Sequence, residues 1–477
     1  MSLTLVLTVL AAYVAVLFIA AAWGDSQART LDAARWRRAW LYSLALGVYC
    51  TSWTFYGAVG EAARNGWDYL PIYLGPAVVF LFGFAIVRRL VTLGRRYDTA
   101  SIAEFLSARY GKSTAVGALA AGGLLLAVIP YIALQLKGAA TSLGVLTGLE
   151  VSTGWAAPVA AAFAAFAILF GQRKPDSAEG HRGLVLAVAL ESVVKIVALA
   201  AVGALALVLL TGGSVEQAAA APPTPLDQPG LDFRFAVITL LAALAALTLP
   251  RQFHMMVAEA REPSDAGASR WIFPGYLLIV ALLAPPIALA GAGALGAANP
   301  DSYVIALPLS AGSEGLALLA FLGGFSAAAG MVTVAALAMS TMLVNDIAAP
   351  LIIRGGGPAG EGGLAARLLT WRRIAVIALV AAAYVFQLGL EPEAPLASLG
   401  LVAFAGAAQL GPALIFGLFW RRANRAGALA GLSTGLSLWV ILILIPSYTG
   451  WQPPAPDGVD PFALFSLVSL IANGLAF

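Results

Sequence analysis

Residues 41–60, LYSLALGVYCTSWTFYGAVG, form an uncharged run that is long enough to cross a bilayer. Small, hydroxyl-bearing and aromatic residues crowd its midpoint: Gly47, Tyr49, Cys50, Thr51, Ser52, Trp53, Thr54, Tyr56 and Gly57. Hydroxyl groups can bond backbone groups where a helix loosens, and aromatic side chains otherwise prefer the membrane surface. The run is therefore either a tight helix-packing face or a broken helix that lines a pocket.

The whole chain has the composition of an integral membrane protein. Of its 477 residues, 61% are hydrophobic and 11% are charged, and the mean hydropathy is +0.89. These values lie far from those of soluble domains and predict one membrane domain built from many helices. The single cysteine, Cys50, excludes an internal disulfide. The two histidines, His181 and His254, each stand beside charged residues, which argues against a zinc site.

Thirteen apolar runs follow one another along the chain, and the basic residues between them indicate a topology. The runs cover residues 3–23, 41–60, 70–91, 115–135, 155–171, 184–211, 235–250, 271–293, 316–345, 371–390, 395–420, 426–446 and 461–477. Most of the 27 Lys and Arg residues lie in alternate loops, whereas the opposite loops hold only Arg64, Lys137 and Arg234. Because basic residues gather on the cytoplasmic side, we predict thirteen spans with the N-terminus outside and the C-terminus in the cytoplasm.

Residues 243–259, ALAALTLPRQFHMMVAE, contain a second candidate for a broken helix. Pro250 removes a backbone donor and clashes with the preceding turn, so a helix must kink or open there. Arg251, Gln252 and His254 follow at once, so the alternative is a helix that ends at the cytoplasmic face.

The two interrupted spans, the second and the seventh, lie five spans apart, which is typical of a transporter built from inverted repeats. We expect residues 41–211 and 235–420 to form the repeats of a single domain that covers residues 1–477. The first helix, within residues 1–40, and the helices of residues 426–477 would lie at the periphery. The glycine-rich loop 355–363 lacks the Lys-Ser/Thr end of a phosphate loop, so we expect no nucleotide site and no nucleic-acid partner.

Several separated motifs carry a family resemblance. Residues 398–435, with Gly-Pro inside one helix, Phe-Trp-Arg-Arg at its end and Gly-Ala-Leu-Ala-Gly opening the next, resemble the late-helix motif of the sodium/solute symporter family. More narrowly, residues 49–60, 101–113, 130–137 and 249–256 resemble the symporter-like input half of bacterial sensor histidine kinases. The resemblance covers essentially the whole chain. It implies an all-α membrane protein of the LeuT-type fold in the bacterial inner (cell) membrane.

In that family the solute and one sodium ion lie where the two broken helices cross. We expect the solute to contact Tyr49, Thr51, Ser52, Trp53, Tyr56, Thr248 and Gln409. The resemblance assigns a sodium site to Gly47, Cys50, Ala327, Gly330 and Ser326. The family's two adjacent hydroxyl positions are Gly330 and Met331 here, and neither side chain has a hydroxyl. A hard cation prefers several oxygen ligands, so both sodium and a proton stay open as the coupling ion.

Two ionisable residues, Glu191 and Lys195, lie deep in the sixth span. At positions i and i+4 they share a helix face and can neutralise one another. One interpretation is a structural bridge that holds helices together. The other is a pair that couples solute movement to protons or gates the ligand, because charge inside a membrane is costly and usually functional.

Three functions are open for this chain. The first is a transporter-fold domain that binds and transports a small polar solute, with an amino acid favoured, and serves as the input of a histidine kinase. Its partners would be a cytoplasmic kinase half or a response regulator. The second is a signal-transducing membrane scaffold without transport, and the third is a stand-alone ion-coupled symporter. We find no catalytic constellation, so this chain is not expected to be an enzyme. The last run stops at Phe477 after about 17 residues, so we expect the final helix to be cut there, with a kinase part following.

Overall fold

The structure is a computed structural model that describes residues 1–149, 153–171, 181–212, 226, 230–296, 298–349, 361–391 and 394–477. Helices are the regular secondary structure throughout these residues, which contain no strand. The prediction of an all-α protein is therefore confirmed. The loop 355–363 and the linker 212–232 lie largely outside the described residues.

The first half of the chain ends with the long helix α10. Its elements are α1 (Leu3–Ser26), α2 (Ala28–Ala33), α3 (Arg35–Ala45), η1 (Leu46–Tyr49), η2 (Trp53–Gly57), α4 (Ala58–Asn65), η3 (Gly66–Tyr69), α5 (Pro71–Leu81), α6 (Phe84–Tyr97), α7 (Ile102–Arg109), α8 (Thr114–Thr147), α9 (Thr153–Gly171) and α10 (Arg182–Thr211). The second predicted span is thus divided among α3, η1, η2 and α4, whereas the fourth and sixth are the long helices α8 and α10.

The second half contains another interrupted span. Its elements are α11 (Phe233–Thr248), α12 (Pro250–Phe253), η6 (His254–Ala258), α13 (Ala266–Leu295), η7 (Pro300–Ser302), α14 (Tyr303–Ser310), α15 (Glu314–Met342), η8 (Leu343–Ala348), α17 (Glu361–Leu388), α18 (Leu396–Ala408), α19 (Gly411–Phe419), α20 (Arg425–Trp439), η9 (Val440–Leu444), α21 (Ile445–Thr449) and α22 (Pro461–Ala476). The seventh predicted span corresponds to α11, α12 and η6.

By length and composition, eight helices of the described residues can cross a membrane, or ten if each of two bent pairs counts as one span. Two shorter apolar helices, Ala156–Phe170 and Pro461–Ala476, lie at two further predicted spans. The divided segment 35–65 lies at the second. The total of thirteen spans and the orientation of the termini stay predictions.

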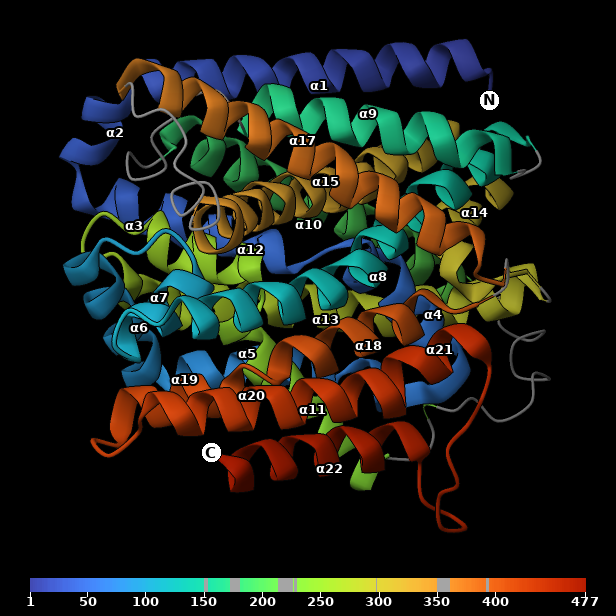
Figure 1. Ribbon diagram of the computed structural model, residues 1–477. Coiled ribbons are helices and arrows are strands. Elements are labelled where there is room, and N and C mark those ends of the chain that lie inside the picture. Colours follow the sequence, from blue (N-terminus) through green and yellow to red (C-terminus); the bar gives the residue numbers. More distant parts are fainter. Residues whose placement is uncertain are drawn as a thin grey trace.

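The helices run side by side, with α1 along one edge of the molecule and α20 and α22 along the opposite edge (Figure 1). Helices α8, α10 and α15 run between these edges, and α15 is almost wholly buried. Small residues permit this close packing. A Cβ atom at Gly75 of α5, for example, would lie 2.5 Å from the backbone nitrogen of Ala243 in α11.

Candidate solute site at two helix breaks

The first break lies in the second span, between η1 and η2. Cys50 has an extended backbone (φ −77°, ψ 110°), and Thr51 belongs to no helix. Two side chains replace the lost helical bonds. The Thr51 N–H donates to Thr54 Oγ1 at 2.8 Å, and the Ser52 N–H donates to Gln135 Oε1 of α8 at 2.9 Å. A broken helix can persist inside a membrane only where such partners exist, so the prediction of a broken second span is confirmed.

The second break lies in the seventh span. Helix α11 ends at Thr248, Leu249 is extended (φ −60°, ψ 130°), and the chain turns by 52° into the segment that begins at Pro250. Proline is tolerated at the first position of a helix because its missing N–H would have no helical partner there. The chain continues as buried helix after the break. The prediction of a broken span is therefore confirmed over the alternative of a helix that simply ends.

The two breaks meet against α8. Arg251 Nη2 donates to the Tyr131 hydroxyl at 2.7 Å, and that hydroxyl lies 3.5 Å from Thr51 Oγ1 of the first break. Gln252 Nε2 also reaches the Leu46 carbonyl, at 3.5 Å. The second and seventh predicted spans therefore cross where both lose regular helical structure.

Arg251 is the most unusual residue at this crossing. Its side chain is 1% exposed, its Nε atom has no hydrogen-bond partner, and it forms no ion pair within the described residues. Its guanidinium lies 4.3 Å from the centroid of the Tyr131 ring, a cation–π contact. A buried charge without a counter-charge is strongly unfavourable, so this site suits an anionic ligand group. The sequence pattern alone did not single out Arg251, because a basic residue after a proline also marks a helix end.

Aromatic side chains pack beside the breaks. The Trp53 ring contacts Phe404 of α18 with centroids 4.8 Å apart, and it meets Tyr131 at 6.4 Å. The Tyr49 ring lies 5.9 Å from Phe404 as well, and its hydroxyl donates to the Ile72 carbonyl at 2.6 Å. Both side chains are at most 2% exposed. They form inner walls of the site and do not face lipid.

Three other predicted solute contacts are buried near the breaks. The Thr248 hydroxyl donates to the Leu244 carbonyl at 2.9 Å, which gives this carbonyl near the end of α11 a hydrogen-bond partner. The Tyr56 and Ser52 hydroxyls are buried without a hydrogen-bond partner among the described residues. The hydroxyl groups of Ser52 and Tyr56 could therefore bond a solute, whereas the Thr248 hydroxyl already bonds a carbonyl of its own helix.

Gln409 lies elsewhere in the fold. Its Nε2 atom donates to Ser469 Oγ of α22 at 2.8 Å, and Asn473 Nδ2 donates to the Gln409 carbonyl at 2.7 Å. The side chain is thus bonded to the last helix, and the structure does not bring it together with Trp53 or Arg251. Gln409 therefore lies outside the crossing of the two breaks.

The predicted sodium position contains a side chain of the protein itself. Lys195 Nζ donates to the Gly47 carbonyl at 2.8 Å and to the Cys50 carbonyl at 3.0 Å. These are the two carbonyls that the family resemblance assigns to sodium. An ammonium group and a sodium ion carry the same charge and use the same oxygen ligands, so the two exclude one another here.

In the other half of the predicted sodium site, the Glu191 carboxylate lies where the family has hydroxyl groups. Any Cβ atom at Gly330 would collide with Glu191 Oε2, so the Glu191 carboxylate lies against this glycine. The Ser326 hydroxyl shares a hydrogen bond with the Tyr13 hydroxyl of α1. Ala327 is buried and offers only its carbonyl. The residues at this position therefore do not fit a sodium ion.

Glu191 and Lys195 share a helix face as expected, but among the described residues they form no ion pair within 4.0 Å. The ammonium bonds the broken second span instead. Both side chains are 3% exposed. Lys195 therefore links α10 to the break in the second span, whereas the interpretation as a bridge had paired it with Glu191.

These features define a class: a helical membrane protein in which two interrupted spans meet through buried polar side chains. Secondary transporters have this architecture. The family model described as "Sodium:solute symporter family" matches residues 35–435. The chain therefore belongs to the sodium:solute symporter family, and it is a multi-pass protein of the bacterial inner membrane.

Two curated relatives share about a quarter of their residues with this chain. The monocarboxylic acid transporter of Corynebacterium glutamicum is 27% identical over 470 residues, which cover 90% of this chain and 81% of the relative. The sodium/pantothenate symporter of Escherichia coli is 26% identical over 440 residues, which cover 89% of this chain and 85% of the relative. Membership in a family of transporters agrees with the expectation that the chain is not an enzyme.

Solved structures share the fold. A sodium-coupled sialic acid symporter, in a substrate-bound outward-open state, superposes with a TM-score of 0.70 at 14% identity, over 99% of this chain and 96% of that chain. MhsT in complex with L-phenylalanine gives a TM-score of 0.54 at 16% identity, over 92% of this chain and 97% of that chain. The LeuT-type fold is thereby confirmed, whereas the resemblance to a kinase input half has no support from these comparisons.

Replacing the aromatic walls tests whether the second span lines the site. We expect Trp53→Ala and Tyr49→Ala each to abolish solute binding while membrane insertion stays intact, because both rings are buried beside the break. Trp271→Ala is the matched control, since that ring is 66% exposed on α13. Ligand-induced thermal stabilisation measures the effect. Affinity unchanged in both variants would remove the second span from the site.

Proposed function

We propose that this chain binds and transports a small polar solute that carries a carboxylate, with an amino acid as the favoured substrate. The observation that carries the proposal is the buried Arg251 guanidinium at the crossing of the two breaks. It donates to the Tyr131 hydroxyl, its Nε atom has no hydrogen-bond partner, and it has no ion pair among the described residues. Carboxylates are the natural partners of arginine, and buried pairs of this kind are directional and strong.

The charge balance at the crossing supports an anionic group. Arg251 and Lys195 are close enough to interact electrostatically, and both are buried. Glu191 supplies one negative charge beside them. The site therefore carries one uncompensated positive charge when these groups are ionised, and a solute carboxylate would neutralise it.

The ammonium group and the side chain of an amino acid would also find partners at the crossing of the two breaks. Interrupted helices expose backbone carbonyls, which suit a solute ammonium. The hydroxyls of Ser52 and Tyr56 offer further unused hydrogen-bond capacity. An apolar solute side chain would pack against Trp53 and Phe404.

We further propose that the domain serves as the sensory input of a histidine kinase, on the strength of the four motifs at residues 49–60, 101–113, 130–137 and 249–256. Solute binding would favour one of two states of the domain by its differential affinity. A cytoplasmic kinase half or a response regulator would receive that change.

Uptake into liposomes tests the proposal. Purified protein is reconstituted and supplied with labelled amino acids and monocarboxylates under separate sodium and proton gradients. We expect uptake of a carboxylate-bearing solute and none of its carboxamide analogue. Solute-induced thermal stabilisation without uptake would instead favour a sensor that binds but does not transport. Neither uptake nor stabilisation with any solute would contradict the proposal.

A further inference from the structure

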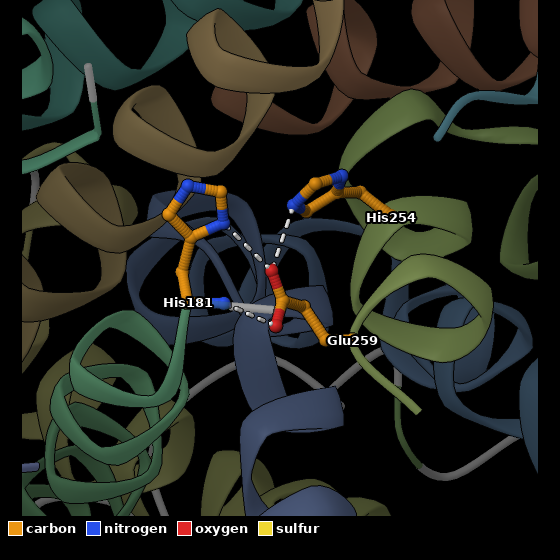
Figure 2. A group of neighbouring side chains, drawn as sticks. All are labelled: His181, His254 and Glu259. Atoms are coloured by element: carbon orange, nitrogen blue, oxygen red, sulfur yellow. Dashed lines mark hydrogen bonds and ion pairs between the residues drawn. The ribbon is translucent and has the colours of Figure 1, made fainter. Parts of the chain in front are cut away.

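The only two histidines of the chain lie together at one end of the molecule, on either side of Glu259 (Figure 2). His181 Nδ1 lies 3.1 Å and His254 Nε2 lies 3.3 Å from the same atom, Glu259 Oε1. The three side chains are 12%, 3% and 3% exposed, respectively. Residues 73 positions apart in the sequence thus converge on one carboxylate oxygen.

His254 is not satisfied by hydrogen bonding. Neither of its ring nitrogens has a hydrogen-bond partner among the described residues, although Nε2 is close to the carboxylate. A buried imidazole without a hydrogen bond is uncommon, because burial removes its contacts with water. His254 therefore lies beside the carboxylate without the alignment of a hydrogen bond, as two ligands of a shared ion do.

The spacing of the three ligand atoms fits a small divalent ion. Zinc binds imidazole nitrogen and carboxylate oxygen at about 2.0–2.2 Å with tetrahedral angles, so two of its ligand atoms lie roughly 3.3 Å apart. The observed separations are 3.1 and 3.3 Å, and all three ligand atoms lie within 4.8 Å of one another. Two imidazoles and one carboxylate are also a common ligand set for zinc, with a fourth position left for water.

The other Glu259 oxygen is held separately. The backbone N–H of His181 donates to Glu259 Oε2 at 2.9 Å, which orients the carboxylate and leaves Oε1 facing the two rings (Figure 2). Such bonds to a ligand's second oxygen are typical around metal ions. The Glu259 Oε1 atom is thereby placed where it could bind a cation together with the two rings.

Neighbouring arginines do not compete for this carboxylate. Arg182 forms an ion pair with Asp32 at 2.8 Å, and Arg261 approaches the same Asp32 at 3.5 Å. Asp32 thus offsets one of these two positive charges. The repulsion of a divalent ion is correspondingly reduced.

We propose that His181, His254 and Glu259 form a binding site for a zinc-class divalent cation. The site joins the start of α10 to η6, the half of the seventh span that follows its break. A bound ion would fasten these two elements to each other at the predicted cytoplasmic end. The proposal is independent of the solute, because it concerns metal binding by the protein alone.

Calorimetric titration of the purified chain with zinc chloride tests the site. The protein carries no polyhistidine tag, is treated with a chelator and is studied in detergent micelles. We expect one zinc ion per chain with a higher melting temperature, and no such effect of magnesium, which prefers all-oxygen ligands. We expect His254→Ala and Glu259→Gln each to weaken zinc binding at least about 100-fold, since even indirect partners of a metal contribute 10- to 100-fold.

Glu262→Gln is the matched control, because this glutamate is 55% exposed and pairs with Arg38; its zinc affinity should equal that of the wild type. Cobalt provides a reading that needs no variant: we expect the intense visible absorption of a tetrahedral nitrogen and oxygen site. No stoichiometric zinc binding at 100 times the protein concentration, wild-type affinity in His254→Ala, or only weak octahedral cobalt absorption would each overturn the proposal.

Discussion

Arg251→Ala is expected to abolish binding of carboxylate-bearing solutes. Truncating one partner of a buried charge-assisted pair costs about 2–5 kcal/mol, which corresponds to a loss of affinity of roughly 30-fold to more than 1,000-fold. Arg251 is 1% exposed and has no ion pair within the described residues, so no carboxylate in that part of the chain competes for it. Binding of a labelled solute to the purified variant, or its loss of solute-induced thermal stabilisation, measures the effect.

Two controls separate recognition from folding. Arg251→Lys keeps the charge but loses the planar fork, so we expect intermediate affinity. Arg261→Ala removes an arginine that is 39% exposed and contacts Asp32, and it should bind solute as the wild type does. Wild-type affinity in Arg251→Ala would exclude the guanidinium from the solute site.

Lys195→Ala is expected to destabilise the protein and to abolish uptake. The substitution leaves the Gly47 and Cys50 carbonyls without their donor and leaves Glu191 buried without its neighbouring cation. Leaving a buried hydrogen-bonding group without its partner costs about 1–3 kcal/mol. Thermal unfolding in detergent measures the first effect, and liposome uptake measures the second.

Lys137→Ala is a suitable control, because Lys137 also donates to backbone carbonyls, those of Glu391 and Ala394, but lies nearer the surface. It should change stability by less than about 1 kcal/mol. Since the ammonium takes the carbonyls assigned to sodium, we also expect wild-type solute binding to be equal in sodium and potassium chloride. Binding that requires sodium, together with wild-type stability of Lys195→Ala, would contradict this description of the site.

The sequence was sufficient for the fold class, and it offered each helix break as one of two alternatives that the structure then decided. Composition requires membrane helices, and Pro250 cannot continue a regular helix, so these predictions rest on local chemistry. The cluster of small and hydroxyl residues around Cys50 likewise identified the first break. The resemblance of residues 398–435 to the late-helix motif identified the family.

The contacts within the site could not be predicted in the same way, because they join residues distant in sequence. Lys195 reaches Gly47, 148 residues away, and Gln135 accepts from Ser52, 83 residues away. No sequence pattern brings Gln135 of α8 to the break in the second span. The two histidines appeared unrelated for the same reason, although both lie beside Glu259.

The proposed function requires that a solute can reach the place where the two interrupted spans cross. Cys50, the only cysteine, lies at the first break and is 3% exposed, so its alkylation reports on this position without any engineered residue. The measurement is the rate at which N-ethylmaleimide labels Cys50 in reconstituted protein, with and without saturating solute. We predict slow labelling that the solute suppresses at least several-fold in the wild type but not in Arg251→Ala. A labelling rate that does not change when solute binds, or a Cys50 that is never labelled, would contradict the proposed function.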